Sequence, residues 1–162
     1  MKLDVPYFKQ DTVYTCGAAS LQMALAFFGY YESESRIAKE ARTEPKEGTT
    51  RKWMIRIATK KGFYCYANNN SSLNEIQYFL SMELPIIVRF TEHSEDVDHY
   101  SIITGLKKGI ITMNDPWNGE NFEMTAEEFE RRWHSEDNDH LRWLMVISKE
   151  KFNIGRQHFP QK

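Results

Sequence analysis

The sequence predicts a single α+β domain, in which helices come first and an antiparallel sheet follows. Apolar residues recur at helical spacing through the first half of the 162 residues, and short β-branched runs separated by turn residues fill the second half. Helical segments followed by consecutive strands are typical of α+β proteins. We expect this domain over residues 1–152, with a helical lobe at about 1–82, a sheet lobe at about 83–152 and a C-terminal tail at 153–162.

Four helices are expected in the first half. The first begins at Cys16, ends before Gly29, and buries a stripe made of Ala18, Leu21, Leu25 and Phe28. The others are expected at 34–41, from behind Thr49-Thr50 to Lys61, and from the capping box 72–75 onward, with which the fourth helix opens. The third of these four is predicted to turn inward Trp53, Ile57 and either Met54 or Ala58, and the fourth to bury Leu73, Ile76, Phe79 and Leu80.

The second half changes to the pattern of strands. Strands are expected at 84–90, 99–105, 109–114 and 142–148, and the link 105–109 is predicted to close a hairpin. A short helix with a second capping box is expected at 125–133, before the last strand.

Composition excludes several classes of protein. Hydrophobic residues make up 41% and charged residues 27% of the chain, which is globular composition and argues against disorder. The net charge of −2 is spread without a basic stripe, so no nucleic-acid partner is expected. The sequence shows no signal peptide, and its longest apolar run, at 85–88, is far too short for a membrane span. We therefore expect a cytoplasmic monomer.

Cys16 is the candidate nucleophile. It stands where an irregular segment leads into the first helix, and the free amides of a helix N-terminus favour a thiolate. Gly17 and Ala18 would leave room for a substrate to approach the sulfur. The alternatives are an inert core cysteine and a disulfide with Cys65, the second of the two cysteines.

Gln10 is the candidate oxyanion donor. It lies six residues before Cys16, and its side-chain amide, with the Cys16 backbone N–H, would stabilise the negative oxygen that forms when a thiolate attacks a carbonyl. A solvated surface glutamine is the alternative.

His99 is the candidate base among five histidines, which are His93, His99, His134, His140 and His158. It opens an apolar run, so a strand would hold it beside a loop. Asp115 ends the following strand, and hairpin pairing would place it next to His99, where a carboxylate could fix the tautomer of the ring. Asp98 and Asn114 compete for this role, but Asp98 should point to the other side of the strand.

Together these residues resemble the C39-like cysteine peptidases, papain-superfamily domains related to the bacteriocin leader-processing peptidases. The resemblance covers about residues 3–147 and rests on segments 5–10, 16–25, 99–105 and 114–116, with Phe129 and Trp133 similar to the closing elements of the family. It implies a papain-like fold with a helical lobe packed on an antiparallel sheet. It also implies that Cys16 is the nucleophile, His99 the acid and base, Asp115 the orienting residue and Gln10 the oxyanion donor. Thr15 departs from the aspartate usual in the exporter peptidases, and we expect a stand-alone domain, so we do not expect this chain to inherit the double-glycine leader substrate.

The expected reaction is hydrolysis of a peptide or small amide through a Cys16 thioester, with no metal or organic cofactor. Acyl or peptidyl transfer from the same thioester remains open, because only the acceptor differs. A non-catalytic papain-like binding module also remains open, as does a metal site at His93, Asp98 and His99, which lacks the usual ligand spacing. The loops 92–97 and 117–122 are expected to border the cleft, with Trp117 as a wall.

Overall fold

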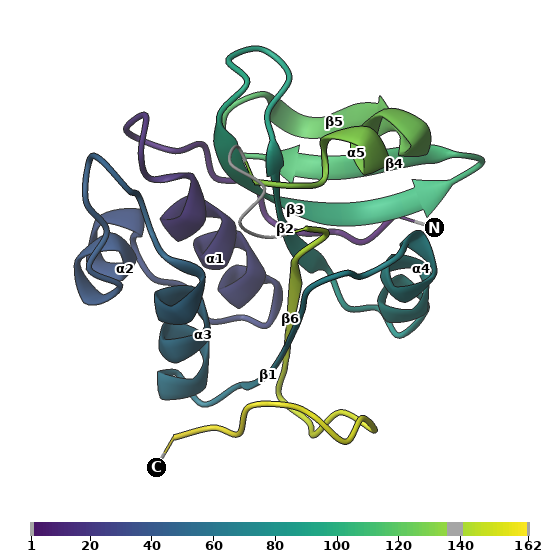
Figure 1. Ribbon diagram of the computed structural model, residues 1–162. Coiled ribbons are helices and arrows are strands. Elements are labelled where there is room, and N and C mark those ends of the chain that lie inside the picture. Colours follow the sequence, from purple (N-terminus) through teal and green to yellow (C-terminus); the bar gives the residue numbers. More distant parts are fainter. Residues whose placement is uncertain (1, 136–140, 162) are drawn as a thin grey trace.

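A computed structural model describes residues 2–135 and 141–161 of the chain. Three helices gather on one side of the molecule, a six-stranded sheet occupies its middle, and two further helices lie on the other side (Figure 1). The helices are α1 (Cys16–Phe27), α2 (Glu34–Glu40), α3 (Arg51–Lys60), α4 (Leu73–Ser81) and α5 (Ala126–Arg132). The strands are β1 (Tyr64–Asn68), β2 (Ile86–Thr91), β3 (Asp98–Lys107), β4 (Ile110–Asp115), β5 (Gly119–Thr125) and β6 (Leu144–Ser148).

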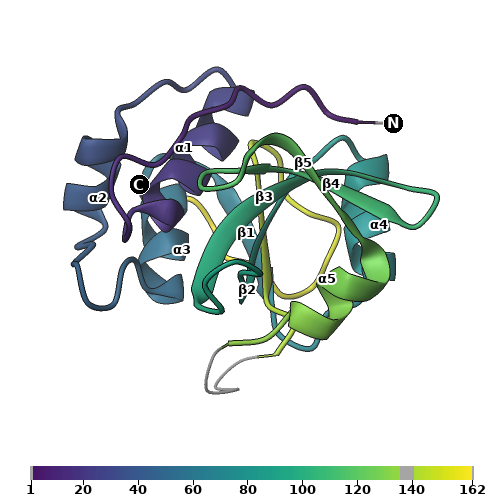
Figure 2. The same cartoon turned by 90° about the horizontal axis from the view of Figure 1, so that it is seen from above.

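The sheet has the order β1-β6-β2-β3-β4-β5, and every pair in it is antiparallel. The predicted α+β class is therefore confirmed. Figure 2 shows the sheet curving between the helix group α1–α3 and the pair α4 and α5. The N-terminal segment is held along β3, where the Leu3 N–H donates to the carbonyl of Thr104 at 2.8 Å.

The expected helices begin where their caps predict. The hydroxyls of Thr50, Ser72 and Thr125 each accept a hydrogen bond from the third residue of the helix that follows. The reciprocal half of the capping box at Ser72 does not form, because the Glu75 carboxylate instead accepts from the Tyr66 hydroxyl and the Asn68 amide. On α3, the buried residues are Met54, Ile57, Ala58 and Thr59. Trp53 is half-buried: it packs against the core and lies under the guanidinium groups of Arg42 and Arg56.

Two strands were not predicted. β1 lies in the half expected to be helical and pairs with β6, which follows it by about eighty residues. β5 pairs with β4 at the edge of the sheet and carries exposed glutamates. The hairpin between β3 and β4 is confirmed, but its turn is tighter than expected, with Lys108 and Gly109 both at positive φ.

The core lies between α1 and the central strands. α1 packs mainly on β3 and on α2, and all of its residues from Gly17 to Ala26 except Gln22 are buried. Gly17 is at the closest approach, because a Cβ there would lie 3.0 Å from atoms of Thr49 and Tyr100. The expectation that Gly17 leaves room for a substrate is therefore wrong: its lack of a side chain lets the helix sit against Tyr100.

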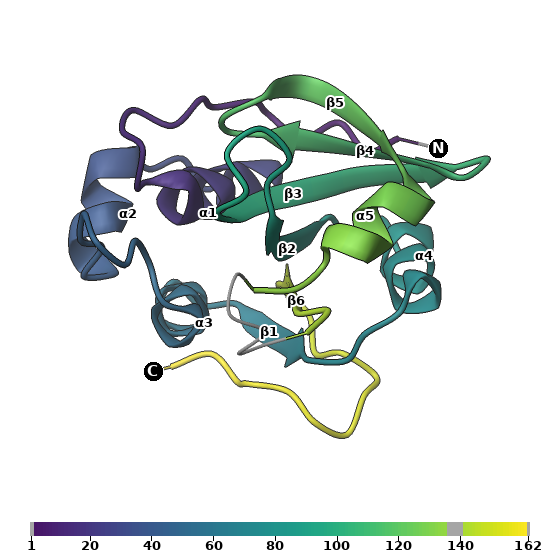
Figure 3. The same cartoon turned by 45° about the horizontal axis from the view of Figure 1, so that its top comes forward.

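The C-terminal tail is packed on the outer strand. The backbone of His158 exchanges two hydrogen bonds with that of Cys65 in β1, at 3.0 and 2.7 Å, and Phe152 is buried against Tyr66 and Phe79. Figure 3 shows this segment passing beneath β1 and returning toward α3.

Candidate active site

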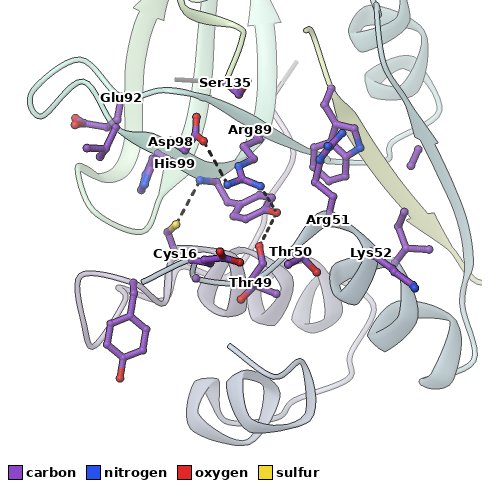
Figure 4. A pocket seen from close by; sticks show the side chains of 18 of the residues that line it. Cys16, Thr49, Thr50, Arg51, Lys52, Arg89, Glu92, Asp98, His99 and Ser135 are labelled. Carbon is purple, nitrogen blue, oxygen red and sulfur yellow. Dashed lines mark hydrogen bonds and ion pairs between the residues drawn. The ribbon is translucent and has the colours of Figure 1, made fainter. Parts of the chain in front are cut away.

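Cys16 lies at the first position of α1 and faces a large cleft. The cleft has a volume of about 1260 Å³ and is bordered by α1, the N-terminal end of α3, the ends of β2 and β3, and the C-terminal tail. The side chain of Cys16 is half-buried, and its sulfur accepts the Tyr100 backbone N–H at 3.5 Å. Figure 4 shows the sulfur pointing toward His99 at the start of β3.

His99 and Asp115 are in direct contact. Nε2 of His99 lies 2.8 Å from Oδ1 of Asp115, and both side chains are buried. The same Oδ1 also accepts the backbone N–H groups of Trp117 and Asn118, at 2.9 and 2.8 Å. Because Nε2 faces the carboxylate, Nδ1 of the ring is the atom left for the sulfur. His99 and Asp115 are not directly opposite each other in the hairpin. Ile102 pairs with Asn114, so His99 and Asp115 meet diagonally across β3 and β4.

The electrostatics of this group favour an ion pair. Burial is the largest influence on Cys16 and alone would raise its pKa, but the charge and hydrogen bond of His99, the Tyr100 N–H and the charge of Arg89 together bring the pKa below that of an ordinary thiol. Burial alone would lower the pKa of His99, whereas its interactions with Cys16 and Asp115 raise that pKa well above the ordinary value. A thiolate beside an imidazolium is the state that these shifts favour.

Gln10 lies on the same cleft, and its side-chain amide is oriented by its own loop. Nε2 donates to the carbonyl of Thr12 at 2.7 Å, and the Gln10 backbone N–H donates to the carbonyl of Pro116 at 3.0 Å. An amide nitrogen carries two hydrogens, so one remains for a ligand. Reversing the amide would bring Oε1 against the Thr12 carbonyl oxygen, which disfavours the flipped orientation.

The competing residues lie elsewhere. Asp98 forms an ion pair with Arg89 at 3.4 Å, and the Asn114 side chain donates to the Val5 carbonyl at 2.8 Å. His93 stacks on Phe122, with ring centres 5.4 Å apart, and residues 2–135 and 141–161 contain no cluster that could hold a metal ion.

The remaining histidines and the second cysteine are also accounted for where the structure describes them. Nδ1 of His134 contacts the Ser135 carbonyl at 2.7 Å, and His158 lines the far end of the cleft. His140 lies outside the described residues. Cys65 is buried in the core and unbridged, and burial raises its pKa.

The predicted border of the cleft is found in part: the loop 92–97 and Trp117 line it, whereas residues 119–122 belong to β5. Trp117 is 42% exposed and lines the cleft, and so do residues of the loop between β2 and β3. Within that loop, Glu92 is buried and accepts hydrogen bonds from Ser94, from the backbone N–H of Glu95 and from Asn118. Burial alone would raise the pKa of Glu92, but these bonds together lower it to about 2. This carboxylate therefore ties the two bordering loops together.

Residues 2–139 match the Peptidase_C39 like family. This protein is a member of that family. The match covers most of the chain and includes each of the four candidate residues.

Individual relatives agree with this assignment. The transport/processing ATP-binding protein ComA of Streptococcus pneumoniae is 27% identical over 120 residues, which is 73% of this chain and 16% of ComA. The chain thus spans only about 16% of the length of the curated relatives it matches. No helix among the described residues is long and apolar enough to cross a membrane.

Solved structures share the fold. The peptidase domain of Streptococcus ComA has a TM-score of 0.74 at 21% identity, covering 92% of this chain and 98% of that domain. A double glycine motif protease from an AMS/PCAT transporter, solved in complex with a leader peptide, has a TM-score of 0.72 at 19% identity, covering 90% and 92% of the two chains. A C39-like peptidase from Bacillus anthracis has a TM-score of 0.70 at 15% identity and covers 93% and 100%.

Sequence reasoning missed one charged residue of this C39-like site. Arg89 lies in β2 with its guanidinium 4.9 Å from the ring centre of Tyr100, and Nη1 donates to the Tyr100 hydroxyl at 3.2 Å. Its charge helps to lower the pKa of Cys16. The signal was present, because Arg89 interrupts the apolar run 86–90, and a charge within a buried strand marks either a cleft or a partner.

Proposed function

We propose that this protein is a cysteine peptidase or amidohydrolase that cleaves a peptide or amide bond through a thioester on Cys16. The observation that carries the proposal is the series of interactions from the sulfur of Cys16 to His99 and on to the buried carboxylate of Asp115, at the wall of an open cleft. Membership of a peptidase family supports it.

The steps follow from the placement of the groups. The Cys16 thiolate attacks the substrate carbonyl carbon, and the oxyanion is held by Nε2 of Gln10 and the backbone N–H of Cys16, an uncapped amide in the first turn of α1. The His99 imidazolium then gives its proton to the leaving amine. Water, deprotonated by His99, attacks the thioester and releases the acid. Asp115 holds the ring through Nε2, so that Nδ1 performs both transfers.

The substrate class is inferred from the shape of the site. The cleft is long enough to extend well beyond the sulfur, and its walls come from several loops, which suits an extended peptide more than a small rigid amide. A leader peptide occupies the related double glycine motif protease. We propose a peptide substrate for this chain, without assigning its sequence.

The test is cleavage of a peptide library by the wild-type protein and by the Cys16→Ala variant, with products identified by mass spectrometry. The proposal expects cleavage that depends on Cys16. Transfer is the second candidate, and added hydroxylamine or amino acid amides distinguish it, since a transferase gives mainly the aminolysis product at low acceptor concentration. A Cys16 that is neither acylated by activated esters nor alkylated faster than Cys65 would instead indicate a binding module.

A further inference from the structure

Glu34 is a buried carboxylate that the proposed mechanism does not use. It is the first residue of α2 and only 6% exposed. Neighbouring Glu32 and Glu40 form ion pairs with Lys61 and Arg36, whereas Glu34 has no ion pair with a lysine or arginine among residues 2–135 and 141–161. Burial, the largest influence, raises its pKa. Burying a carboxylate without a cation costs free energy, so hydrogen bonds from neighbouring groups have to offset that cost.

Those hydrogen bonds go to the loop between Gln10 and Cys16. Oε2 of Glu34 accepts the Asp11 backbone N–H at 2.9 Å, and the Thr15 hydroxyl also hydrogen-bonds to the carboxylate. The Thr15 oxygen in turn accepts the Thr12 backbone N–H at 3.1 Å. One side chain from α2 thus fixes three positions of the loop that ends at Cys16.

The Thr12 carbonyl connects this network to Gln10. The Thr15 hydroxyl donates to the Thr12 carbonyl oxygen at 3.2 Å and also interacts with the Glu34 carboxylate. A carbonyl oxygen has two lone pairs, so the same Thr12 oxygen also accepts Nε2 of Gln10, at 2.7 Å, and joins Thr15 to the Gln10 amide. The bond to Thr12 uses one amide hydrogen and leaves the other for a ligand in the cleft that Gln10 lines.

We propose that Glu34 is a positioning residue for the oxyanion-binding amide of Gln10, acting through Thr15 and the Thr12 carbonyl. This inference rests on the proposed function, because it gives Gln10 its role in the thioester chemistry. Loss of Glu34 frees the loop, so the Gln10 amide spends less time aimed at the oxyanion while the sulfur and His99 keep their contact.

Two reagents separate this role from a merely structural one. p-Nitrophenyl acetate acylates a cysteine when the thiolate attacks the ester carbonyl, an oxyanion forms, and p-nitrophenolate leaves a thioester on Cys16. Iodoacetamide alkylates the same thiolate by displacing iodide at a saturated carbon, with no oxyanion. The ratio of the two rate constants therefore reports the oxyanion site and cancels changes in the thiolate itself.

The experiment compares Glu34→Gln, Gln10→Ala and the double variant, each in the full chain. Removing one oxyanion donor costs about 10²–10³-fold in known cases, so we expect Gln10→Ala to lower acylation by up to that factor and Glu34→Gln by roughly tenfold, with alkylation unchanged. In the Gln10→Ala background, Glu34→Gln is expected to add nothing, because both act on one donor. Thr15→Val should lower the ratio of acylation to alkylation as Glu34→Gln does, whereas Thr15→Ser, which keeps the hydroxyl, should have the wild-type ratio.

Glu32→Gln is the matched control. It removes the same charge two residues away, from a side chain that pairs with Arg36 and Lys61, so its ratio of acylation to alkylation should stay at the wild-type value. Multiplicative effects of Glu34→Gln and Gln10→Ala, or an equal loss of acylation and alkylation in Glu34→Gln, would overturn the inference. Failure of the proposed function looks different, because the wild-type protein itself would then not be acylated at Cys16.

Discussion

A single oxygen of Asp115, Oδ1, accepts three hydrogen bonds, from Nε2 of His99 and from the backbone amides of Trp117 and Asn118, all within 2.9 Å. The second oxygen, Oδ2, is buried and makes no hydrogen bond within the part of the chain that the structure describes. The carboxylate therefore binds His99 and the turn after β4 through the same atom. Its charge and its geometry can consequently be separated by substitution.

Asp115→Asn is the substitution that separates them. The amide oxygen can replace Oδ1 in all three bonds, while the amide nitrogen would occupy the unbonded place of Oδ2 at a cost of about 1–3 kcal/mol in the free energy of unfolding. Losing the negative charge lowers the pKa of His99, so the alkaline limb of the rate profile should move to lower pH. Asp98→Asn, one residue before His99, should leave that limb in place. An unchanged limb in Asp115→Asn would contradict the orienting role.

Cys16→Ala should lower the rate of cleavage roughly 10³-fold or more, because it removes the thiolate that interacts with His99. The residue is only half-buried, so the melting temperature should stay close to that of the wild type. Cys65→Ala is the matched control: it creates a small cavity in the core and lowers the melting temperature, but leaves the rate intact. Residual cleavage by Cys16→Ala at the wild-type rate would point to another nucleophile.

The rate of peptide cleavage should depend on pH as a bell. The thiolate forms as pH rises through the lowered pKa of Cys16, below the ordinary value of 9.0, and the imidazolium is lost as pH rises through the raised pKa of His99, above its ordinary 6.5. The plateau should lie between these two limbs and begin below the pH at which an ordinary thiol ionises. Initial rates across the pH range at constant ionic strength test this, and a rate that only begins to rise near pH 9 would refute the ion pair.

Arg89→Gln should raise the pKa of Cys16, because one of the charges that stabilise the thiolate is removed. At a pH below the wild-type pKa, alkylation of Cys16 should slow about two- to fivefold, whereas at high pH the rates should converge. Arg131→Gln, an exposed charge on α5, should match the wild type throughout. Equal slowing of Arg89→Gln at all pH values would instead indicate a blocked cleft.

Ser72→Ala tests a feature remote from the site. The hydroxyl caps α4 by accepting the Glu75 N–H at 3.3 Å, and such caps contribute about 0.5–2 kcal/mol. Chemical denaturation should give a loss of that size in the free energy of unfolding, with cleavage unchanged. No loss would mean that the bonds of Glu75 to Tyr66 and Asn68 hold the first turn by themselves.

The helices and the central strands could be predicted because their signals are local. Gly29 takes a positive φ just beyond the end of α1, and capping hydroxyls precede α3, α4 and α5. β1 could not be predicted, since its five residues gain their stability from pairing with β6, and no short-range pattern reveals a partner so distant. β5 was missed for a different reason: it is an edge strand, and its exposed glutamates mask the alternation.

The contacts of the site were predictable only where register implies them. His99 and Asp115 end neighbouring strands, so their meeting follows from the hairpin. Glu34 lies at the start of a separate helix, and nothing in its sequence context points to the Asp11 amide. Likewise, the charge of Arg89 acts on Cys16 only because β2 and β3 pack against α1, which no local sequence pattern reveals.

The pH dependence of iodoacetamide labelling at Cys16, followed by intact mass in the wild-type protein and in His99→Ala, tests the pairing of sulfur and imidazole most directly. The Cys65→Ala background confines labelling to one thiol. We predict that wild-type Cys16 reacts with an apparent pKa well below 9.0, and that His99→Ala moves this pKa upward, since the charge and hydrogen bond of His99 are what lower it. An apparent pKa at or above 9.0 that does not respond to His99→Ala would contradict the account.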